Sequence, residues 1–161
     1  MSEVNFRRSI LGQFTDPSKM DLLFKQKLAN FTLDWTEQFG RPLFKALTEA
    51  DRHALVSLRT PLSNTQAEFD AQVLALTKTI IDSLNEAELA KATHNIEANT
   101  KGIGQLEAFL TGKGLVGAEP HIKFLRTLWN LRHGAGHRKG EAYERAADSF
   151  DVEQRGYTQA F

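Results

Sequence analysis

Ten residues near the end of the chain, from 131 to 140, combine two histidines, three cationic side chains and three glycines. Histidine takes up and releases protons near neutral pH, and the planar guanidinium of arginine matches the oxygens of a phosphate. Glycine lets the backbone approach a ligand closely. These residue types in one short stretch predict a site for acid–base chemistry on a phosphodiester, in a glycine-kinked loop at the end of the preceding helix.

Two other interpretations of the same stretch stay open on the residues alone. Arginine and histidine favour the negative end of a helix dipole and glycine ends helices, so the stretch can be a cationic helix cap. Alternatively, His133, His137 and Glu141 are spaced four apart and can line one helix face as metal ligands. The glycines within that window and the neighbouring cations argue against the metal site, so we expect no bound metal.

Arg132 and His137 are separated by four residues, with polar His133 directly after the arginine. This spacing resembles the R-x4-H motif of the HEPN superfamily. The stretch from 124 to 143, FLRTLWNLRHGAGHRKGEAY, is similar to HEPN-like C-terminal domains of bacterial defence and toxin proteins. The resemblance implies an all-α, up-and-down helical bundle of HEPN type with glycine-interrupted connections.

The resemblance also implies an activity, a metal-independent endoribonuclease without a cofactor, in a toxin or antiviral defence role. The 2′-hydroxyl of RNA attacks the adjacent phosphate and leaves a 2′,3′-cyclic phosphate. By this likeness His137 is the general acid or base, Arg132 binds the scissile phosphate and His133 assists. Two copies of the motif are expected to meet in a homodimer with a composite active site across the two-fold axis.

Further cations around the motif are candidates for binding the substrate. Between residues 121 and 145 six Lys and Arg residues face two Glu residues, a local excess of four positive charges on a chain of net charge zero. Such an excess indicates anion binding, although an ordinary solvated face has the same composition. The candidate substrate-binding residues are Arg126, Asn130, Arg138 and Lys139.

One position departs from the family pattern. The subfamily paired with nucleotidyltransferase antitoxins often has a tyrosine two residues after the histidine, where this chain has Lys139, and Tyr143 lies six residues on. Regulation by nucleotide attachment is therefore in doubt, while an antitoxin or a sensor domain remains an expected kind of partner. The alternative function is a non-catalytic HEPN module for dimerisation or for binding RNA or a nucleotide.

Composition limits the other classes of protein. The chain has 161 residues, 41% of them hydrophobic, enough for one domain with a core. No cysteine is present, so disulfides and thiolate metal sites are excluded. No apolar run approaches a membrane span, and the N-terminus lacks the apolar core of a signal peptide. We expect a cytoplasmic protein with no membrane partner.

Apolar spacing and caps predict helices and no strand. A long helix follows Asp16-Pro17, a capping box spans 48–51, and a further helix follows 63–66 until Asn85 interrupts it. Later helices are expected at 103–110, from 119 to breaks at Gly134, Gly136 and Gly140, at 141–150 and after Asp151. Residues 1–161 are expected to form one domain with 1–15 as a loosely ordered arm, in what is expected to be a piece of a longer protein.

Overall fold

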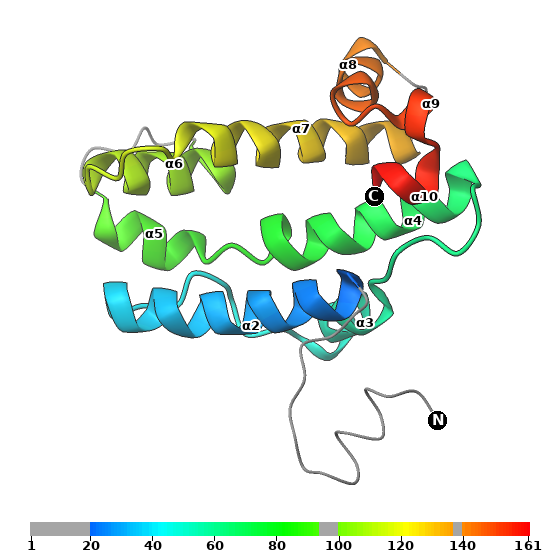
Figure 1. The fold of residues 1–161 in the computed structure, drawn as a ribbon. Helices are drawn as coiled ribbons and strands as arrows, with labels where there is room; N and C mark the ends of the chain where they lie inside the picture. Colours follow the sequence, from blue (N-terminus) through cyan, green and yellow to red (C-terminus); the bar gives the residue numbers. More distant parts are fainter. Residues whose placement is uncertain (1–19, 94–99, 137–139) are drawn as a thin grey trace, which may run out of the picture.

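The computed structural model describes residues 20–93, 100–136 and 140–161, with the backbone alone for Ala50 and for 133–136. Across these residues the fold is all-α, as predicted (Figure 1). The expected arm at 1–15 and the Asp16-Pro17 helix start lie outside the described residues. The elements are α2 (Met20–Phe39), α3 (Glu49–Ser57), α4 (Gln66–Thr77), the π-helix η1 (Lys78–Asp82), α5 (Glu86–Ala92), α6 (Ile103–Gly112), α7 (Glu119–Gly136), α8 (Glu141–Ser149), α9 (Val152–Arg155) and α10 (Tyr157–Ala160).

The helices lie in three layers. Figure 1 shows α2 along one side, α4 and α5 in the middle, and α6 and α7 on the other side. α7 runs antiparallel to α4, and α8 and α9 cover the end of that pair. None of the described helices is long and apolar enough to cross a lipid bilayer. Arg132 and the other described residues of the motif lie on α7, which is held in place by its antiparallel packing against α4.

Two connected apolar clusters hold the layers together. The first joins α4, η1, α7, α8 and α9, and the second joins α2, α5, α6 and the start of α7. Ile103 and Leu125 pack against both clusters, so the two are continuous. The buried side chains of the first cluster include Phe69, Val73, Leu128 and Leu131, and those of the second include Leu84, Leu89, Phe109 and Ile122.

The predicted helix start at 48–51 is confirmed with its cap, and Asn85, expected only to interrupt a helix, caps the start of α5. The side chain of Thr48 accepts a hydrogen bond from the backbone N–H of Asp51, and the side chain of Asn85 accepts one from Glu88. The preceding helical run ends at Asp82, three residues before Asn85. Each cap satisfies a backbone donor that has no partner within the helix.

The start of α4 is built differently from the prediction that residues 63–66 cap it. Thr65 occupies the N-cap position without a side-chain hydrogen bond. Instead Glu68 reaches back, and its carboxylate accepts hydrogen bonds from the backbone N–H groups of Leu62 and Ser63 at 2.9 and 2.8 Å. The Ser63 hydroxyl and the Arg59 guanidinium also donate to it. Glu68 thus ties the α3–α4 connection to the first turn of α4.

These contacts predict a loss of stability in acid. The hydroxyl and backbone N–H of Ser63 and the N–H of Leu62 lower the pKa of Glu68 from 4.5 to about 2. Because the folded pKa lies below the unfolded one, this stabilisation is complete above about pH 4.5 and is lost as the pH falls towards 2. We expect Glu68→Gln to flatten the fall of the melting temperature between pH 5 and 2.5. The control Glu144→Gln removes an exposed carboxylate of α8 and should leave the slope unchanged; equal slopes for both variants would contradict the prediction.

Of the breaks expected at Gly134, Gly136 and Gly140, the first does not form, because α7 continues through Gly134 to Gly136. A glycine in a helix interior costs about 1 kcal/mol relative to alanine. The buried Leu128 and Leu131 hold α7 against α4, and α8 packs on the same end of α7. Tertiary packing at this end therefore outweighs the local preference. The glycine-kinked loop inferred from the sequence is, up to Gly136, a continuation of the helix.

Candidate functional site

Arg132 lies on α7 at the border between the core and the surface. Its neighbour Leu131 is 2% exposed and belongs to the α4–α7 core, whereas the Arg132 side chain is 23% exposed. Because successive helical residues point about 100° apart, the buried leucine fixes the direction in which the arginine leaves the helix. The guanidinium is thereby directed to the edge of the α7–η1 contact.

Two side chains fix the guanidinium of Arg132. Its Nη1 donates to both carboxylate oxygens of Asp82, at 2.7 and 2.8 Å. The guanidinium carbon lies 4.8 Å from the ring centroid of Trp129, which is three residues earlier on α7 and on the same side of the helix. A charged hydrogen bond on one side and an aromatic ring on the other hold the guanidinium in one orientation.

The position of Asp82 depends on an irregular turn. Asp82 is the last residue of η1, where the helix widens to a π-helix. Two buried hydroxyls where α4 passes into η1 bond to the preceding turn: Thr77 donates to the Val73 carbonyl at 3.0 Å and Thr79 to the Ala75 carbonyl at 2.8 Å. Such side-chain bonds compete with the regular helix ladder, and π-turns of this kind occur frequently at functional sites.

The backbone immediately after Asp82 is held by the segment between α2 and α3. Lys45 N–H donates to the Ser83 carbonyl and Asn85 N–H donates to the Leu43 carbonyl, both at 2.7 Å. Phe44 and Leu84 form an isolated antiparallel bridge between these bonds. The backbone on both sides of Asp82 is therefore fixed. The hydroxyl bonds of Thr77 and Thr79 hold the residues before it, and the bridge holds the residues after it.

The other candidate site residues are placed to different extents. Arg126 is exposed and its Nη2 donates to Glu107 of α6, and Asn130 is exposed on α7. Positions 126, 130 and 133 recur at spacings of four and three, so their backbone positions share one face of α7. For His133 the structure describes the backbone only. His137, Arg138 and Lys139 lie outside the described residues.

Acidic residues from other elements reduce the positive charge around the motif. Asp82 pairs with Arg132 and Glu107 pairs with Arg126, which brings the local excess from four positive charges to two. The sequence count missed both partners because they lie 50 and 19 residues upstream of their arginines. The patch is therefore a weaker anion attractor than the sequence indicates.

Tyr143, the tyrosine nearest to the position expected for nucleotide attachment, is a core residue. It lies on α8 and is 5% exposed, packed in the α4–α7–α8 cluster. Burial raises the pKa of its hydroxyl above 10.0, with the charge of Asp70 acting in the same direction. A phenol that is buried and held neutral is a poor nucleophile and a poor target for an attacking enzyme, so the doubt about this switch is strengthened.

The metal interpretation stays undecided by the geometry. In the described part of the chain, no cluster of three or more His, Asp and Glu side chains is placed to hold a metal ion. The proposed ligands His133 and His137 do not contribute described side chains. Glu141 begins α8 and is exposed, with a long 3.9 Å ion pair to Arg145.

Two nitrogens of the Arg132 guanidinium, Nε and Nη2, are left to bind a ligand. Both bonds to Asp82 come from Nη1, and among contacts with described residues Nε and Nη2 carry no hydrogen bond. Two donors on one planar group can bind two oxygens of a phosphate. The large apolar cavity of about 610 Å³ lies elsewhere, along α2, and Arg132 is not among its lining residues.

Comparison with known proteins adds no assignment. No protein-family model, no curated protein and no solved structure matches this chain. The functional inference therefore depends on the motif and on the geometry around Arg132.

Two residues of the site, Asp82 and Trp129, were not found by sequence reasoning. Trp129 had a signal, since an aromatic residue three positions before an arginine on a helix lies within stacking reach. The structure shows Trp129 half-buried, packed against the first apolar cluster and beside the guanidinium. Asp82 had no signal, because only the packing of η1 beside α7 brings it to Arg132.

Proposed function

We propose that this protein is a metal-independent endoribonuclease of HEPN type. The observation that carries the proposal is the fixed guanidinium of Arg132, which starts the R-x4-H spacing on a helix held firmly by the core. A preorganised cation stabilises charge that develops on a phosphate without reorganising during the reaction. The all-α fold and the position of the motif near the C-terminal end of a long helix support the same proposal.

In the proposed reaction the RNA supplies its own nucleophile. The 2′-oxygen bonds to phosphorus while the bond from phosphorus to the 5′-oxygen breaks, giving a 2′,3′-cyclic phosphate and a 5′-hydroxyl. One proton leaves the 2′-hydroxyl and one is delivered to the 5′-oxygen. His137 serves as the acid or the base for these transfers, and Nε and Nη2 of Arg132 bind the phosphate oxygens. A second copy across a two-fold axis would supply the partner histidine.

The direct test is cleavage of single-stranded RNA of mixed sequence in the presence of EDTA. We expect fragments with cyclic phosphate at one end and a 5′-hydroxyl that accepts a label from polynucleotide kinase without prior phosphatase treatment. The matched control is DNA of the same sequence, which lacks the attacking hydroxyl and should remain intact. Cleavage of both polymers, or 5′-phosphate ends on the RNA, would refute the mechanism.

The ion pair with Asp82 favours a second candidate, a non-catalytic module that binds RNA or a nucleotide. A carboxylate beside Arg132 offsets the positive charge that a scissile phosphate needs, which matters less for a module that only binds. This candidate predicts intact RNA after long incubation together with a raised melting temperature in the presence of RNA or a nucleotide. Unchanged melting curves across a panel of both would count against it.

A further inference from the structure

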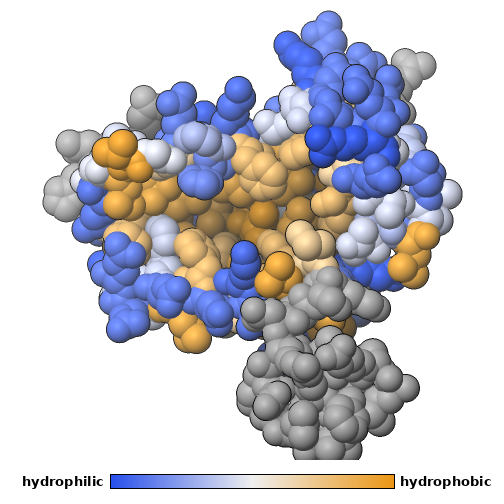
Figure 2. Space-filling model, viewed as in Figure 1, coloured by the Kyte–Doolittle hydropathy of each residue, from blue (hydrophilic) through white to orange (hydrophobic). Residues whose placement is uncertain are grey.

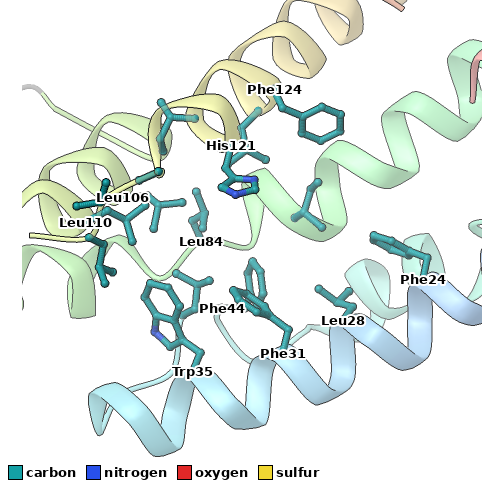
Figure 3. Close-up of a pocket in the computed structure, with 18 residues that line it drawn as sticks. Phe24, Leu28, Phe31, Trp35, Phe44, Leu84, Leu106, Leu110, His121 and Phe124 are labelled. Atoms are coloured by element: carbon teal, nitrogen blue, oxygen red, sulfur yellow. The ribbon is translucent and has the colours of Figure 1, made fainter. Parts of the chain in front are cut away.

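An apolar groove runs along α2 on the side facing α7. Figure 2 shows apolar surface across the middle of this face of the molecule. In Figure 3 Phe24, Leu28, Phe31 and Trp35 point from α2 into the groove, His121 points into it from α7, and Phe124 of α7 lines its edge. Leu84 and Phe44 lie between the two walls. The volume is about 610 Å³, and His121 is the one titratable residue in the lining formed by the described chain.

The groove exists because α2 contacts the rest of the bundle at its two ends. At one end the ring of Trp35 lies 5.5 Å from that of Phe109. At the other end Phe24 packs against the Ala54 and Leu58 cluster, and Lys25 donates to the Val56 carbonyl. Between these ends Leu28 and Phe31 face the open space.

The walls of the groove leave large apolar side chains in contact with solvent. Phe31 on α2 and Phe124 on α7 are each 46% exposed. A contiguous apolar surface that continues into a hollow is unfavourable in water and marks a binding site. The open groove therefore requires an occupant.

The geometry points to residues 4–14 of this chain as the occupant of the groove. The sequence VNFRRSILGQF places Phe6, Ile10 and Phe14 four residues apart, the spacing of one helix face. Such a face matches a groove whose lining is almost entirely apolar. Docking would bury these three side chains together with Phe31 and Phe124.

The length of residues 4–14 and their short link to α2 favour this segment over a separate molecule as the occupant. As a helix, eleven residues span about 16 Å. The part of α2 that lines the groove, from Phe24 to Trp35, is a helix of about the same length. Residues 15–19, five in number, join the segment to Met20 at the start of α2, next to the Phe24 end of the groove. Their extended reach of about 17 Å allows the chain to turn back along α2. A segment joined by so short a connection has an effective concentration in the millimolar range, above that of a second copy at ordinary protein concentrations.

Cross-linking tests this placement directly, because the chain has no cysteine of its own. The pair Ile10→Cys and Phe31→Cys is treated with a short bis-maleimide and compared with Ile10→Cys and Leu33→Cys. Leu33 is an exposed residue of α2 outside the groove. We expect the first pair to cross-link about tenfold faster and within one chain. Equal rates for the two pairs would overturn the proposal, and links between chains would assign the groove to a second copy.

A second test measures dye binding after substitutions in the N-terminal segment, with the residues that line the groove left unchanged. The full chain carrying Phe6→Ala, Ile10→Ala and Phe14→Ala is compared with one carrying Asn5→Ala, Ser9→Ala and Gln13→Ala, the positions directly before them. We expect the first variant to bind the apolar dye 8-anilinonaphthalene-1-sulfonate severalfold more strongly than the native chain, since the groove is uncovered, and the second to bind it as the native chain does. Equal dye binding by both variants and the native chain would overturn the proposal.

Discussion

Arg132→Ala is expected to lower the rate of RNA cleavage by about a hundredfold to a thousandfold, the usual cost of removing one group that stabilises transition-state charge. The guanidinium is already oriented by Asp82 and Trp129, so its contribution is available without rearrangement. The measurement is kcat and KM for single-stranded RNA in EDTA, with the melting temperature as a check on folding. The control Arg155→Ala removes an exposed arginine of α9 that pairs with Asp151.

Two companion variants separate catalysis from positioning. His137→Ala should reduce kcat by about a hundredfold to ten-thousandfold and remove the pH dependence of the rate, because a general acid or base is lost. Asp82→Asn keeps the shape of the side chain and loses its charge, so Arg132 remains but is held less firmly. We expect this change to lower kcat by about tenfold to a hundredfold with little effect on KM. Full activity of Arg132→Ala would refute the ribonuclease proposal for this site.

The second large effect is expected on stability. Leu131→Ala should lower the free energy of unfolding by about 2 to 5 kcal/mol, since the leucine is 2% exposed and its removal leaves a cavity between α4 and α7. For a chain of this size, this corresponds to a melting temperature lower by about 5 to 15 °C. The measurement is chemical and thermal unfolding followed by circular dichroism.

The matched control is Leu62→Ala, the same substitution at a residue that is 80% exposed. It should change the unfolding free energy by less than about 0.5 kcal/mol. Similar losses in the two variants would show that Leu131 is not part of a packed core. Because Leu131 also directs Arg132, the variant should lose RNA cleavage at temperatures where it is still folded.

Most helices could be predicted from the sequence because their signals are local. Thr48 bonds to a backbone donor three residues on, and Pro120 suits the first turn of α7. The starts of α8 and α9 likewise follow Gly140 and Asp151, as expected. The prediction failed where packing opposes local preference, at Gly134, and where a side chain beyond the cap makes the contacts, at Glu68.

The candidate site divides in the same way. Arg132 and the His137 spacing could be recognised from the sequence, because residue type and separation along the chain define the motif. Asp82 could not be found, since no local pattern relates two residues 50 positions apart. The contact forms because Ile81 of η1 packs in one cluster with Leu128 and Leu131 of α7.

The sequence by itself determined the helical class, most helix starts and the residues able to carry phosphate chemistry, since all of these depend on side chains within about a turn of one another. Only the tertiary structure decided the orientation of Arg132, the charge that offsets it, the burial of Tyr143 and the open groove beside α2. These features arise where elements distant in the chain pack together. Their geometry depends on the volumes and contacts of the whole core, and no short stretch of sequence contains that information.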